Sequence, residues 1–275
     1  RSVIVVALNY HNEDSLEGEF RISRYAHGSV DYHSVLRKRM KSLTRIMRDI
    51  APQEITRAVV DTAPLLERDF ARLAGIGWFG KNTMLISREI GSWFFLGAIL
   101  TTAELQYDAP FKKDYCGSCD ACLQACPTNA FPEPGVLDAN RCISYLTIER
   151  RTRPVDESLR AGMGNWVFGC DVCQEVCPWN RFAPSQSPSE FHLRDELRSI
   201  SLETLLRLDD GEFQKLFKGT PLERTGRDAI VRNAAIAAGN QNKGSLRPVL
   251  TSLLSDSSPI VNDAAKWALA QLAPD

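Results

Sequence analysis

All eight cysteines of this 275-residue chain fall between residues 116 and 177, and the long segments on either side have none. Proteins stapled by disulfides are usually short, secreted and rich in cysteine throughout, which this chain is not. Cysteines gathered in one part of a longer chain are more typical of metal ligands in a reducing compartment. We therefore expect a cytoplasmic protein whose central region is built around bound metal.

The spacing of the cysteines indicates two iron–sulfur clusters of the 4Fe–4S type. The first run is C-x2-C-x2-C-x3-C followed by proline, in which three thiolates bind one cluster and the fourth binds the other. The second run, C-x2-C-x3-C followed by proline, lacks one cysteine, and Cys142 is the only thiol left to replace it. This crossed arrangement uses every thiol once. It assigns Cys116, Cys119, Cys122 and Cys177 to one cluster and Cys126, Cys142, Cys170 and Cys173 to the other.

Zinc is the main alternative, because cysteine pairs two residues apart also build tetrahedral zinc sites. Zinc sites need neither a triple C-x2-C-x2-C run nor the Cys-Pro pairs, so the pattern favours iron–sulfur clusters, which transfer single electrons. A ferredoxin needs little more chain than such a region. The long flanking segments therefore indicate that the clusters deliver electrons to another part of the protein.

The composition excludes several other classes. Apolar residues make up 44% of the chain, enough for a sizeable core and a smaller second domain. The net charge of −1 gives no sign of a protein that is basic over its whole surface. The chain has no apolar run of about 18 residues to span a membrane and does not open with a signal peptide. It opens without methionine inside a short β-branched run, so we expect further residues upstream.

Three segments with different patterns predict an α+β fold. Residues 1–110 mix strands and helices and are expected to form an α/β lobe. Residues 111–184 form the cysteine region, which we expect to be a ferredoxin-like domain held together by its clusters rather than by a large core. Residues 185–275 are expected to be helical.

The first segment has two clear strands and two clear helices. The β-branched run 3–8 predicts a strand, and the apolar, aromatic run 92–100 predicts a buried central strand. Apolar residues recur at helical spacing over 34–50 and again over 65–73. These four elements predict a sheet covered by amphipathic helices.

The third segment predicts a series of short helices. Thr225 is expected to cap a helix that Gly239 ends, and residues 245–254 form a second helix. Ser258 is expected to cap a third helix with Pro259 in its first turn. Alanine-rich helices separated by short turns are similar to HEAT repeats, although the same pattern fits a small helical cap.

A glycine-rich stretch at residues 75–82 fits the G-x-G-x-x-G pattern of nucleotide-binding loops. That pattern requires a strand before the glycines and a helix after them, whereas here a predicted helix precedes and a predicted strand follows. Asn82 also stands where a P-loop has the Ser or Thr that binds magnesium. We therefore expect a helix end and a turn rather than a nucleotide site.

Several stretches together resemble epoxyqueuosine reductase, the corrinoid enzyme of the last step of queuosine synthesis. They are residues 23–26, 31–33, 60–68, 75–82, 91–97, 141–149, 169–174 and 177–181. The resemblance runs over nearly the whole chain. It implies an N-terminal lobe similar to that of corrinoid reductive dehalogenases, followed by the cluster region and HEAT-like C-terminal helices.

The resemblance also implies an activity. A cobalamin bound between the N-terminal lobe and the clusters would receive electrons one at a time. The reduced cobalamin would then convert the epoxide of epoxyqueuosine in tRNA to the cyclopentene of queuosine. An external electron donor, a monomeric protein and no membrane association are expected with it.

Asp61 is the residue that matches the acid of this family and is the expected proton donor. It follows a probable strand end, and a corrin covering its carboxyl would raise its pKa by desolvation. The alternative from the residues alone is an aspartate that caps the helix opening near Pro64. His33 is the second candidate, with an exposed histidine at a helix start as its alternative.

The remaining site residues follow from the same resemblance. The D-x-H-x-x-G signature of cobalamins with a histidine ligand does not occur around any histidine, so we expect a corrin without one. The residues expected to contact the corrin are Arg24, His33, Asp61, Leu85, Arg88, Leu96 and Ser144. The residues expected to contact tRNA phosphates are Arg150, Arg224, Arg227 and Arg232, with Arg151, Arg153, Arg181, Lys215 and Lys218 as further basic candidates.

Three other functions fit part of the pattern. A dehalogenase-like corrinoid reductase acting on a small molecule leaves the helical tail without a purpose. A two-cluster electron carrier with a helical interaction module leaves the N-terminal lobe and Asp61 unexplained. An RNA-binding protein stabilised by metal has no use for redox-active iron.

Overall fold

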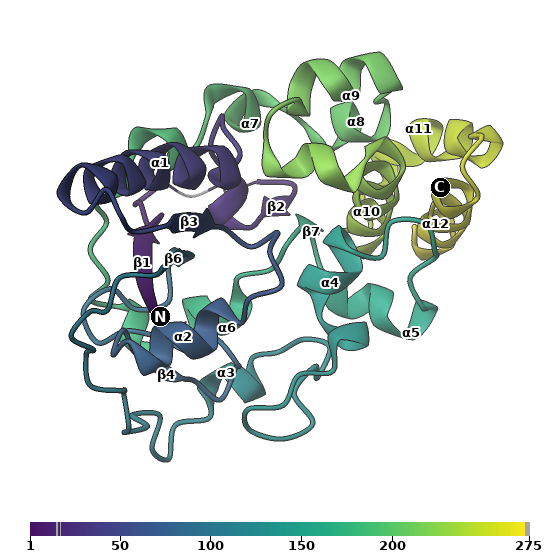
Figure 1. The fold of residues 1–275 in the computed structure, drawn as a ribbon. Helices are drawn as coiled ribbons and strands as arrows, with labels where there is room; N and C mark the ends of the chain where they lie inside the picture. The colour runs from purple at the N-terminus through teal and green to yellow at the C-terminus, as the bar shows by residue number, and fades with distance from the viewer. Residues whose placement is uncertain (15, 17, 273–275) are drawn as a thin grey trace.

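The N-terminal lobe is a three-stranded antiparallel sheet in the order β1-β6-β3, with one helix on each face (Figure 1). Its strands are β1 (Ser2–Asn9), β6 (Phe94–Thr101) and β3 (Thr56–Val59), in a computed structural model that describes residues 1–14, 16 and 18–272. β6 is the middle strand, so the prediction of a buried central strand is confirmed.

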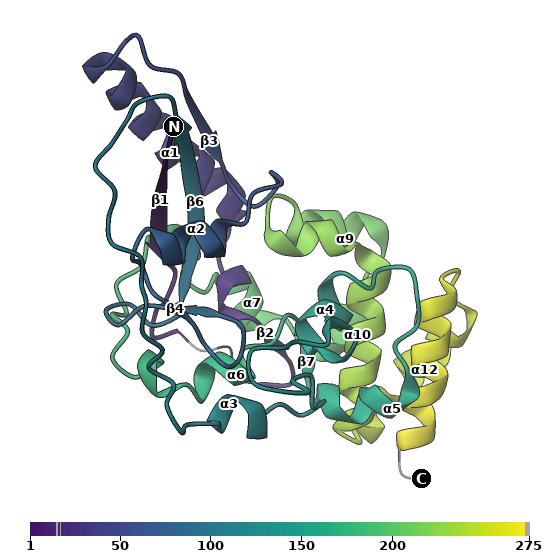
Figure 2. The same cartoon turned by 60° about the horizontal axis from the view of Figure 1, so that its bottom comes forward.

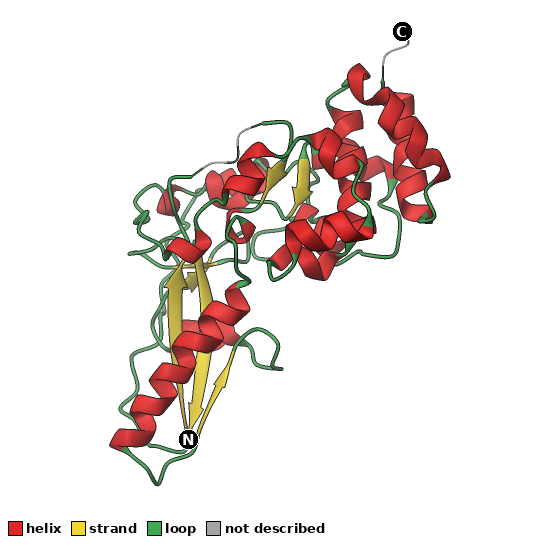
Figure 3. Ribbon diagram, turned by 90° about the horizontal axis from the view of Figure 1, so that it is seen from above, coloured by secondary structure: helices red, strands yellow, loops and turns green. Residues whose placement is uncertain are grey.

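Alternation along β6 explains how both faces of the sheet are covered. Phe95 and Ile99 pack against helix α1 (Tyr32–Ile50), which runs along one face of the sheet (Figure 3). Phe94 and Leu96 point to the opposite face and pack in the apolar cluster of helix α2 (Glu67–Leu73). Successive residues of a strand face opposite sides, so one apolar run supplies two cores. The predicted helices are confirmed, with α1 beginning two residues earlier.

The cysteine region consists of loops and short elements, as the sequence predicts. Its helices are α3 (Ala121–Gln124), α4 (Ile143–Ile148), α5 (Glu157–Arg160) and α6 (Val172–Glu175). Its strand β7 (Trp166–Phe168) pairs in parallel with β2 (Arg21–Ile22) from the N-terminal lobe. The hairpin of β4 (Trp78–Phe79) and β5 (Leu85–Ile86) lies beside the cysteine region (Figure 2).

The C-terminal part is helical, as predicted. Its α-helices are α7 (Asp195–Ser199), α8 (Leu202–Leu206), α9 (Asp210–Phe217), α10 (Arg227–Asn240), α11 (Arg247–Ser252) and α12 (Pro259–Gln271). Short 3-10 turns along the whole chain are η1 (Arg24–Ala26), η2 (Ala139–Arg141), η3 (Ala161–Met163), η4 (Pro178–Asn180), η5 (Ser189–Phe191), η6 (Pro221–Thr225), η7 (Gly244–Leu246) and η8 (Leu253–Ser255). The HEAT-like character of these helices stays a prediction. No helix in the described part of the chain is long and apolar enough to cross a membrane.

Two details of α10 differ from the prediction. Gly226 rather than Thr225 precedes the helix, at a φ of 84° that favours glycine. The helix also continues through Gly239 instead of stopping there. A Cβ atom on Gly239 would lie 2.8 Å from the Trp267 ring and 2.9 Å from the Ala268 Cα. This glycine therefore permits close packing of α10 on α12, a tertiary reason that the local sequence does not reveal.

The largest core joins all three predicted segments. It contains Phe20 and Ile22 from the N-terminal lobe, Leu146 and Phe168 from the cysteine region, and the buried faces of the C-terminal helices. The domain limits expected from the sequence remain predictions. The packing shows that the second half of the cysteine region is built onto the C-terminal helices.

Two buried polar side chains of α10 hold this junction together. Arg232 is 1% exposed and donates hydrogen bonds to the carbonyls of Leu146, Arg150 and Arg153. The neighbouring Asn233 is fully buried and donates to Thr147 O at 3.0 Å and Val167 O at 2.8 Å. These bonds satisfy the carbonyls at the end of α4 and in β7, which water does not reach.

We expect Asn233→Ala to destabilise the protein strongly, because it leaves two buried carbonyls without donors. At about 1–3 kcal/mol for each of the two unsatisfied groups and about 2–4 °C per kcal/mol, the apparent melting temperature falls by at least about 4 °C. Circular dichroism of the cluster-loaded protein measures it. Gln214→Ala on the exposed face of α9 is the control and leaves the melting temperature unchanged. Equal melting of both variants would contradict this role of Asn233.

Candidate active site

The first predicted cysteine group surrounds a single cavity. Cys116, Cys119, Cys122 and Cys177 all line a space of about 240 Å³, together with the aromatic rings of Tyr115 and Trp179. Four thiols around one tetrahedral metal ion would leave no such space, whereas a cubane of iron and sulfide needs it. Among the described residues, no three side chains of the metal-binding types lie close enough to hold a single ion. Cys119 is exposed, so this group lies at the protein surface.

The second group consists of Cys126, Cys142, Cys170 and Cys173, all of which are partly buried. Burial, together with the smaller effects of the nearby Asp171, Cys142 and Cys126, raises the pKa of the Cys170 thiol to about 12. Burial followed by the charges of Cys170 and Cys142 also raises the pKa of Cys173. Thiols that oppose one another's ionisation in this way lie close together, and bound iron would relieve the repulsion.

Main-chain N–H groups point at several of these sulfur atoms. The Ala130 N–H donates to Cys126 Sγ at 3.3 Å. Burial raises the pKa of the Cys142 thiol, and hydrogen bonds from the N–H groups of Tyr145 and Ser144 partly offset this effect. Donors of this kind stabilise negative charge on cluster sulfur and influence the reduction potential.

The glycine-rich loop connects the N-terminal lobe to both cysteine groups. Lys81 Nζ donates to Gly117 O at 2.7 Å and to Cys119 O at 2.8 Å. The side-chain amide of Asn82 donates to Cys173 O at 3.3 Å. Helix α2 precedes the stretch, β4 lies within it and β5 follows, so the context is the inverse of a nucleotide-binding loop, as predicted. Lys81 and Asn82 at the end of this stretch thus position the cluster loops instead of binding a phosphate.

Asp61 lies two residues beyond β3, with a left-handed φ of 46°. Its Oδ2 atom accepts hydrogen bonds from Tyr32 Oη at 2.7 Å and from His33 Nε2 at 3.1 Å. The N-cap of α2 is Leu66, so the alternative in which Asp61 caps that helix is wrong. A strained backbone at an exposed carboxylate is typical of functional loops.

The pKa of Asp61 differs from the sequence-based expectation. The hydrogen bond from His33 lowers it to about 2, although partial burial opposes the shift. The expected rise required a corrin over the carboxyl, whereas in this structure the carboxyl faces an imidazole and a phenol. The low pKa of Asp61 favours its carboxylate form, and the raised pKa of His33 favours a proton on the imidazole rather than on Asp61.

His33 is held between two carboxylates. Its Nδ1 lies 2.8 Å from Asp31 Oδ1, and hydrogen bonds to Asp31 and then to Asp61 raise its pKa. Asp31 is the N-cap of α1 and also accepts from the His33 N–H. His33 is 6% exposed, so the expected alternative of an exposed helix-start histidine is wrong. Asp31 and Tyr32 were not predicted to have a role in the site. An aspartate directly before an amphipathic helix is nevertheless a recognisable cap signal.

The other residues expected to contact a corrin lie in four places. Leu85 and Leu96 belong to the same apolar cluster under α2. Arg88 is exposed, with its guanidinium 5.2 Å from the Tyr115 ring beside the first cysteine group. Ser144 lies in the first turn of α4, of which Cys142 is the N-cap.

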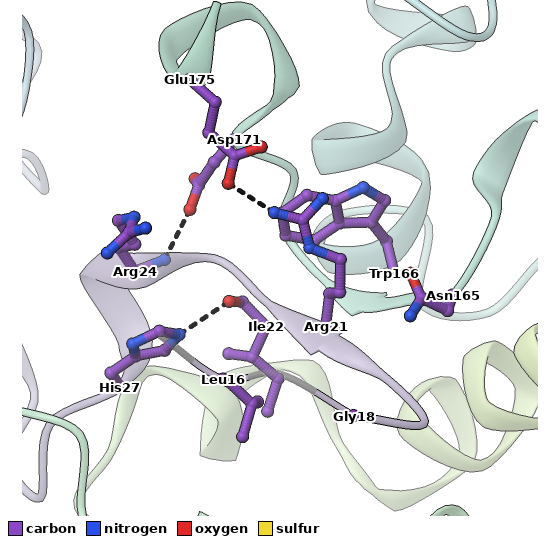
Figure 4. A pocket seen from close by; sticks show the side chains of 10 residues that line it. All are labelled: Leu16, Gly18, Arg21, Ile22, Arg24, His27, Asn165, Trp166, Asp171 and Glu175. Atoms are coloured by element: carbon purple, nitrogen blue, oxygen red, sulfur yellow. Dashed lines mark hydrogen bonds and ion pairs between the residues drawn. The ribbon is translucent and has the colours of Figure 1, made fainter. Parts of the chain in front are cut away.

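Arg24 lines a separate cavity of about 400 Å³ next to the second cysteine group (Figure 4). Its main-chain N–H donates to Asp171, which stands between Cys170 and Cys173, at 2.7 Å. The same cavity contains His27, whose Nε2 faces Ile22 O at 2.8 Å (Figure 4). Arg24 thus connects the N-terminal lobe to the loop of the second group.

The four arginines expected to bind tRNA have different surroundings. Arg232 is buried and binds main-chain carbonyls, so it is not available to a phosphate. Its prediction as a tRNA contact is wrong. Arg227 forms a two-pronged pair with Asp256, at 3.0 and 2.7 Å. Arg150 lies 3.4 Å from Asp156. The exposed candidates Arg151, Arg153, Arg181, Lys215 and Lys218 remain accessible.

Comparison with known proteins agrees with this geometry. Residues 115–180 match the family model of a 4Fe-4S double cluster binding domain, and residues 1–62 match that of epoxyqueuosine reductase QueG, DUF1730. The epoxyqueuosine reductase of Xanthomonas campestris is 40% identical over 98% of this chain and 78% of its own length. That of Pseudomonas aeruginosa is 44% identical over 90% of this chain and 68% of its own length.

This chain belongs to the epoxyqueuosine reductase family. A crystal structure of an epoxyqueuosine reductase matches 99% of the chain and 74% of its own chain, with a TM-score of 0.90 and 33% identity. A second structure, of an epoxyqueuosine reductase with an epoxyqueuosine-modified tRNA-Tyr stem loop, matches 98% of this chain and 72% of its own at a TM-score of 0.89 and 33% identity. The family confirms an oxidoreductase and leaves no support for an electron carrier without catalysis.

For this family member we expect the cysteine groups to behave as the crossed pattern requires. Replacing Cys116 and Cys177 together by alanine removes one cluster, so the reconstituted chain keeps about four irons, as either single variant does. Replacing Cys116 and Cys142 together removes both clusters. Iron and sulfide analysis measures this. Loss of both clusters in the first pair, with one retained in the second, would refute the assignment.

Proposed function

We propose that this chain reduces epoxyqueuosine in tRNA to queuosine, using electrons from two 4Fe–4S clusters and a bound cobalamin. The observation that carries the proposal is the Asp61–His33 pair on the same lobe whose glycine-rich loop binds both cysteine groups. An epoxide becomes an alkene by taking up two electrons and two protons, and its oxygen leaves as water. The site therefore needs both an electron route and a proton donor, and this chain has candidates for each.

Burial gives the electron route a direction. The first cysteine group includes the exposed Cys119, whereas burial strongly raises the pKa of Cys170 and Cys173 in the second group. We propose that an external donor reduces the first cluster and that electrons pass from it to the second. A cytoplasmic, monomeric protein suits this role, because the thiols must stay reduced and the substrate is tRNA.

The residues present are compatible with a corrin beside the second group. The Ser144 N–H donates to Cys142, and the partly buried Leu96 lies on the same lobe as Asp61, with the buried Leu85 in the same apolar cluster. The histidines are engaged elsewhere: His33 with two carboxylates, His27 with Ile22 O, His192 with Ser187 O, and His11 stacked on Trp93. A cobalamin bound there would deliver electrons to the epoxide carbon. Arg24, Arg88, Leu96 and Ser144 would hold it, with Leu85 in the apolar cluster that supports Leu96, and no histidine of the chain is proposed as a ligand of its metal.

The chain itself supplies one of the two protons, and solvent supplies the other to the oxygen that leaves as water. We propose that Asp61 presents to the epoxide oxygen the proton that it shares with His33 through the 3.1 Å contact. The hydrogen bonds to Asp31 and Asp61 raise the pKa of His33 and so favour the protonated imidazole. Tyr32 fixes the carboxylate from the other side and has a raised pKa from burial, so it acts as a hydrogen-bond donor.

Accessible cations of the C-terminal half are proposed to bind the tRNA backbone. Arg150, Arg151 and Arg153 follow α4, and Lys215 and Lys218 lie at the end of α9. Phosphate contacts supply most of the affinity for nucleic acid and weaken as salt rises. Arg227 is proposed to bind a phosphate only if its ion pair with Asp256 breaks.

We expect Asp61→Asn to lose turnover while keeping both clusters. Asparagine tolerates a positive φ and preserves the shape of the loop, but it provides no acid. The rate of queuosine formation under reducing conditions falls by about 100-fold or more. Asp49→Asn at the far end of α1 is the control, and iron content and retained cobalamin are measured in both variants. Turnover close to that of the unmodified protein would exclude Asp61 as the donor.

We also expect turnover to fall as pH rises through the raised pKa of His33. Below that pKa the imidazole keeps its proton, and above it the proton is lost, whereas Asp61, with a pKa of about 2, stays ionised throughout. His33→Gln lowers kcat by about tenfold or more and removes this alkaline fall. Measuring kcat between pH 5 and about 9 tests it. An unchanged alkaline fall in His33→Gln would assign it to another group.

A further inference from the structure

A side chain from the C-terminal helices reaches the proposed proton donor. η6 carries Arg224, and its guanidinium forms an ion pair with the Asp31 carboxylate at the start of α1. Arg224 Nη1 also lies 3.2 Å from His33 Nδ1. Residues 193 positions apart in the chain therefore meet behind the imidazole that holds Asp61.

Asp31 is the centre of this contact. One carboxylate oxygen accepts from the His33 ring and the His33 main chain, and the other receives Arg224. The Asp31 N–H donates to Gly219 O at 2.7 Å, and Gly219 N–H donates to the Glu223 side chain at 2.7 Å. The loop before η6 thus holds the main chain of Asp31 while Arg224 holds its side chain.

Arg224 also contacts the second partner of Asp61. Its guanidinium carbon lies 5.7 Å from the centre of the Tyr32 ring. Tyr32 stacks on Phe95 at 4.3 Å and on His33 at 4.1 Å, and its hydroxyl donates to Asp61. Both hydrogen bonds that orient the Asp61 carboxylate therefore come from rings that Arg224 touches.

We propose that Arg224 is a positioning residue for the proton donor, a role that rests on the function proposed above. By fixing both oxygens of Asp31 together with His33, it sets the tilt of the imidazole and keeps Nε2 directed at Asp61. Its positive charge also balances the two carboxylates around His33, which would otherwise draw the ring toward either one. The C-terminal helices are thereby a part of the active site.

A role in binding tRNA makes a different demand on the same side chain. A phosphate would have to displace the Asp31 carboxylate, which is 17% exposed and already desolvated in the pair. Arg224 is 40% exposed, so a phosphate has access to it. The two roles separate experimentally, because a phosphate contact sets affinity whereas a positioning residue sets the rate of the proton step.

The first experiment uses the cluster-loaded protein without cobalamin or tRNA. Nitrogen-15 NMR of the histidine rings compares the unmodified protein with Arg224→Ala, Arg224→Lys and the control Arg207→Ala, an exposed arginine paired with Glu203 on α8. The His33 signals are identified by their absence in His33→Gln. We expect Arg224→Ala to shift or broaden only the His33 signals and Arg224→Lys to restore them in part. The control leaves all four histidines unchanged.

The second experiment measures kinetics on tRNA substrate with the complete protein. Arg224→Ala is expected to lower kcat by about 5- to 50-fold, with KM for tRNA changed less than about twofold, and Arg224→Lys to recover part of kcat. An unperturbed His33 spectrum together with a raised KM and unchanged kcat would overturn the proposal and make Arg224 a phosphate contact. If the protein proves inactive on tRNA, the proposed function fails, and the NMR comparison still decides whether Arg224 positions His33.

Discussion

The buried pair Arg232–Asn233 is the interaction on which the arrangement of the molecule depends. From one turn of α10 it satisfies carbonyls at the end of α4, in the loop after it and in β7. α4 begins directly after Cys142, and β7 ends shortly before Cys170. A loop-rich region with little core of its own cannot hold these two cysteines in register, so a helix of the next segment does it instead. The cost of leaving such carbonyls unpaired in the core makes the junction well defined.

The proton donor is likewise built from residues of more than one segment of the chain. Asp61 comes from the end of β3, its partners His33 and Tyr32 come from the first turn of α1, and the residue behind them comes from η6. The N-terminal lobe provides the acid, while the C-terminal part determines how the acid is held. Electrons and protons thus reach the site from different parts of the chain: through cysteine loops held by Lys81 and Asn82 on one side, and through the Asp31–His33 pair on the other.

Local pattern predicted the features that depend on local chemistry. The spacing of the cysteines gave a partition in which four predicted ligands surround one cavity, and periodicity gave α1, β6 and the helical end. The resemblance pointed to Asp61 and His33. Contacts between residues far apart in the sequence were not predicted, and nothing in the sequence pairs Arg224 with Asp31. Gly239 was predicted to end a helix, because its packing against α12 cannot be inferred from the local sequence. Arg232 looked like a surface cation because charge indicates exposure only on average, and a buried guanidinium needs a set of carbonyls that only the fold provides.

The charges around His33 show why the acid needs a partner from so far away. An imidazole between two carboxylates gains a proton easily, but the two carboxylates then compete for its N–H groups. If Asp31 were free, it would hold the imidazolium as a simple ion pair and weaken the contact with Asp61. Arg224 neutralises Asp31 and occupies its second oxygen, so the balance moves toward Asp61, the carboxylate that faces outward. A cation that touches neither the substrate nor Asp61 can therefore decide whether the shared proton is available for transfer, and its place on η6 makes this depend on the docking of the C-terminal helices against α1.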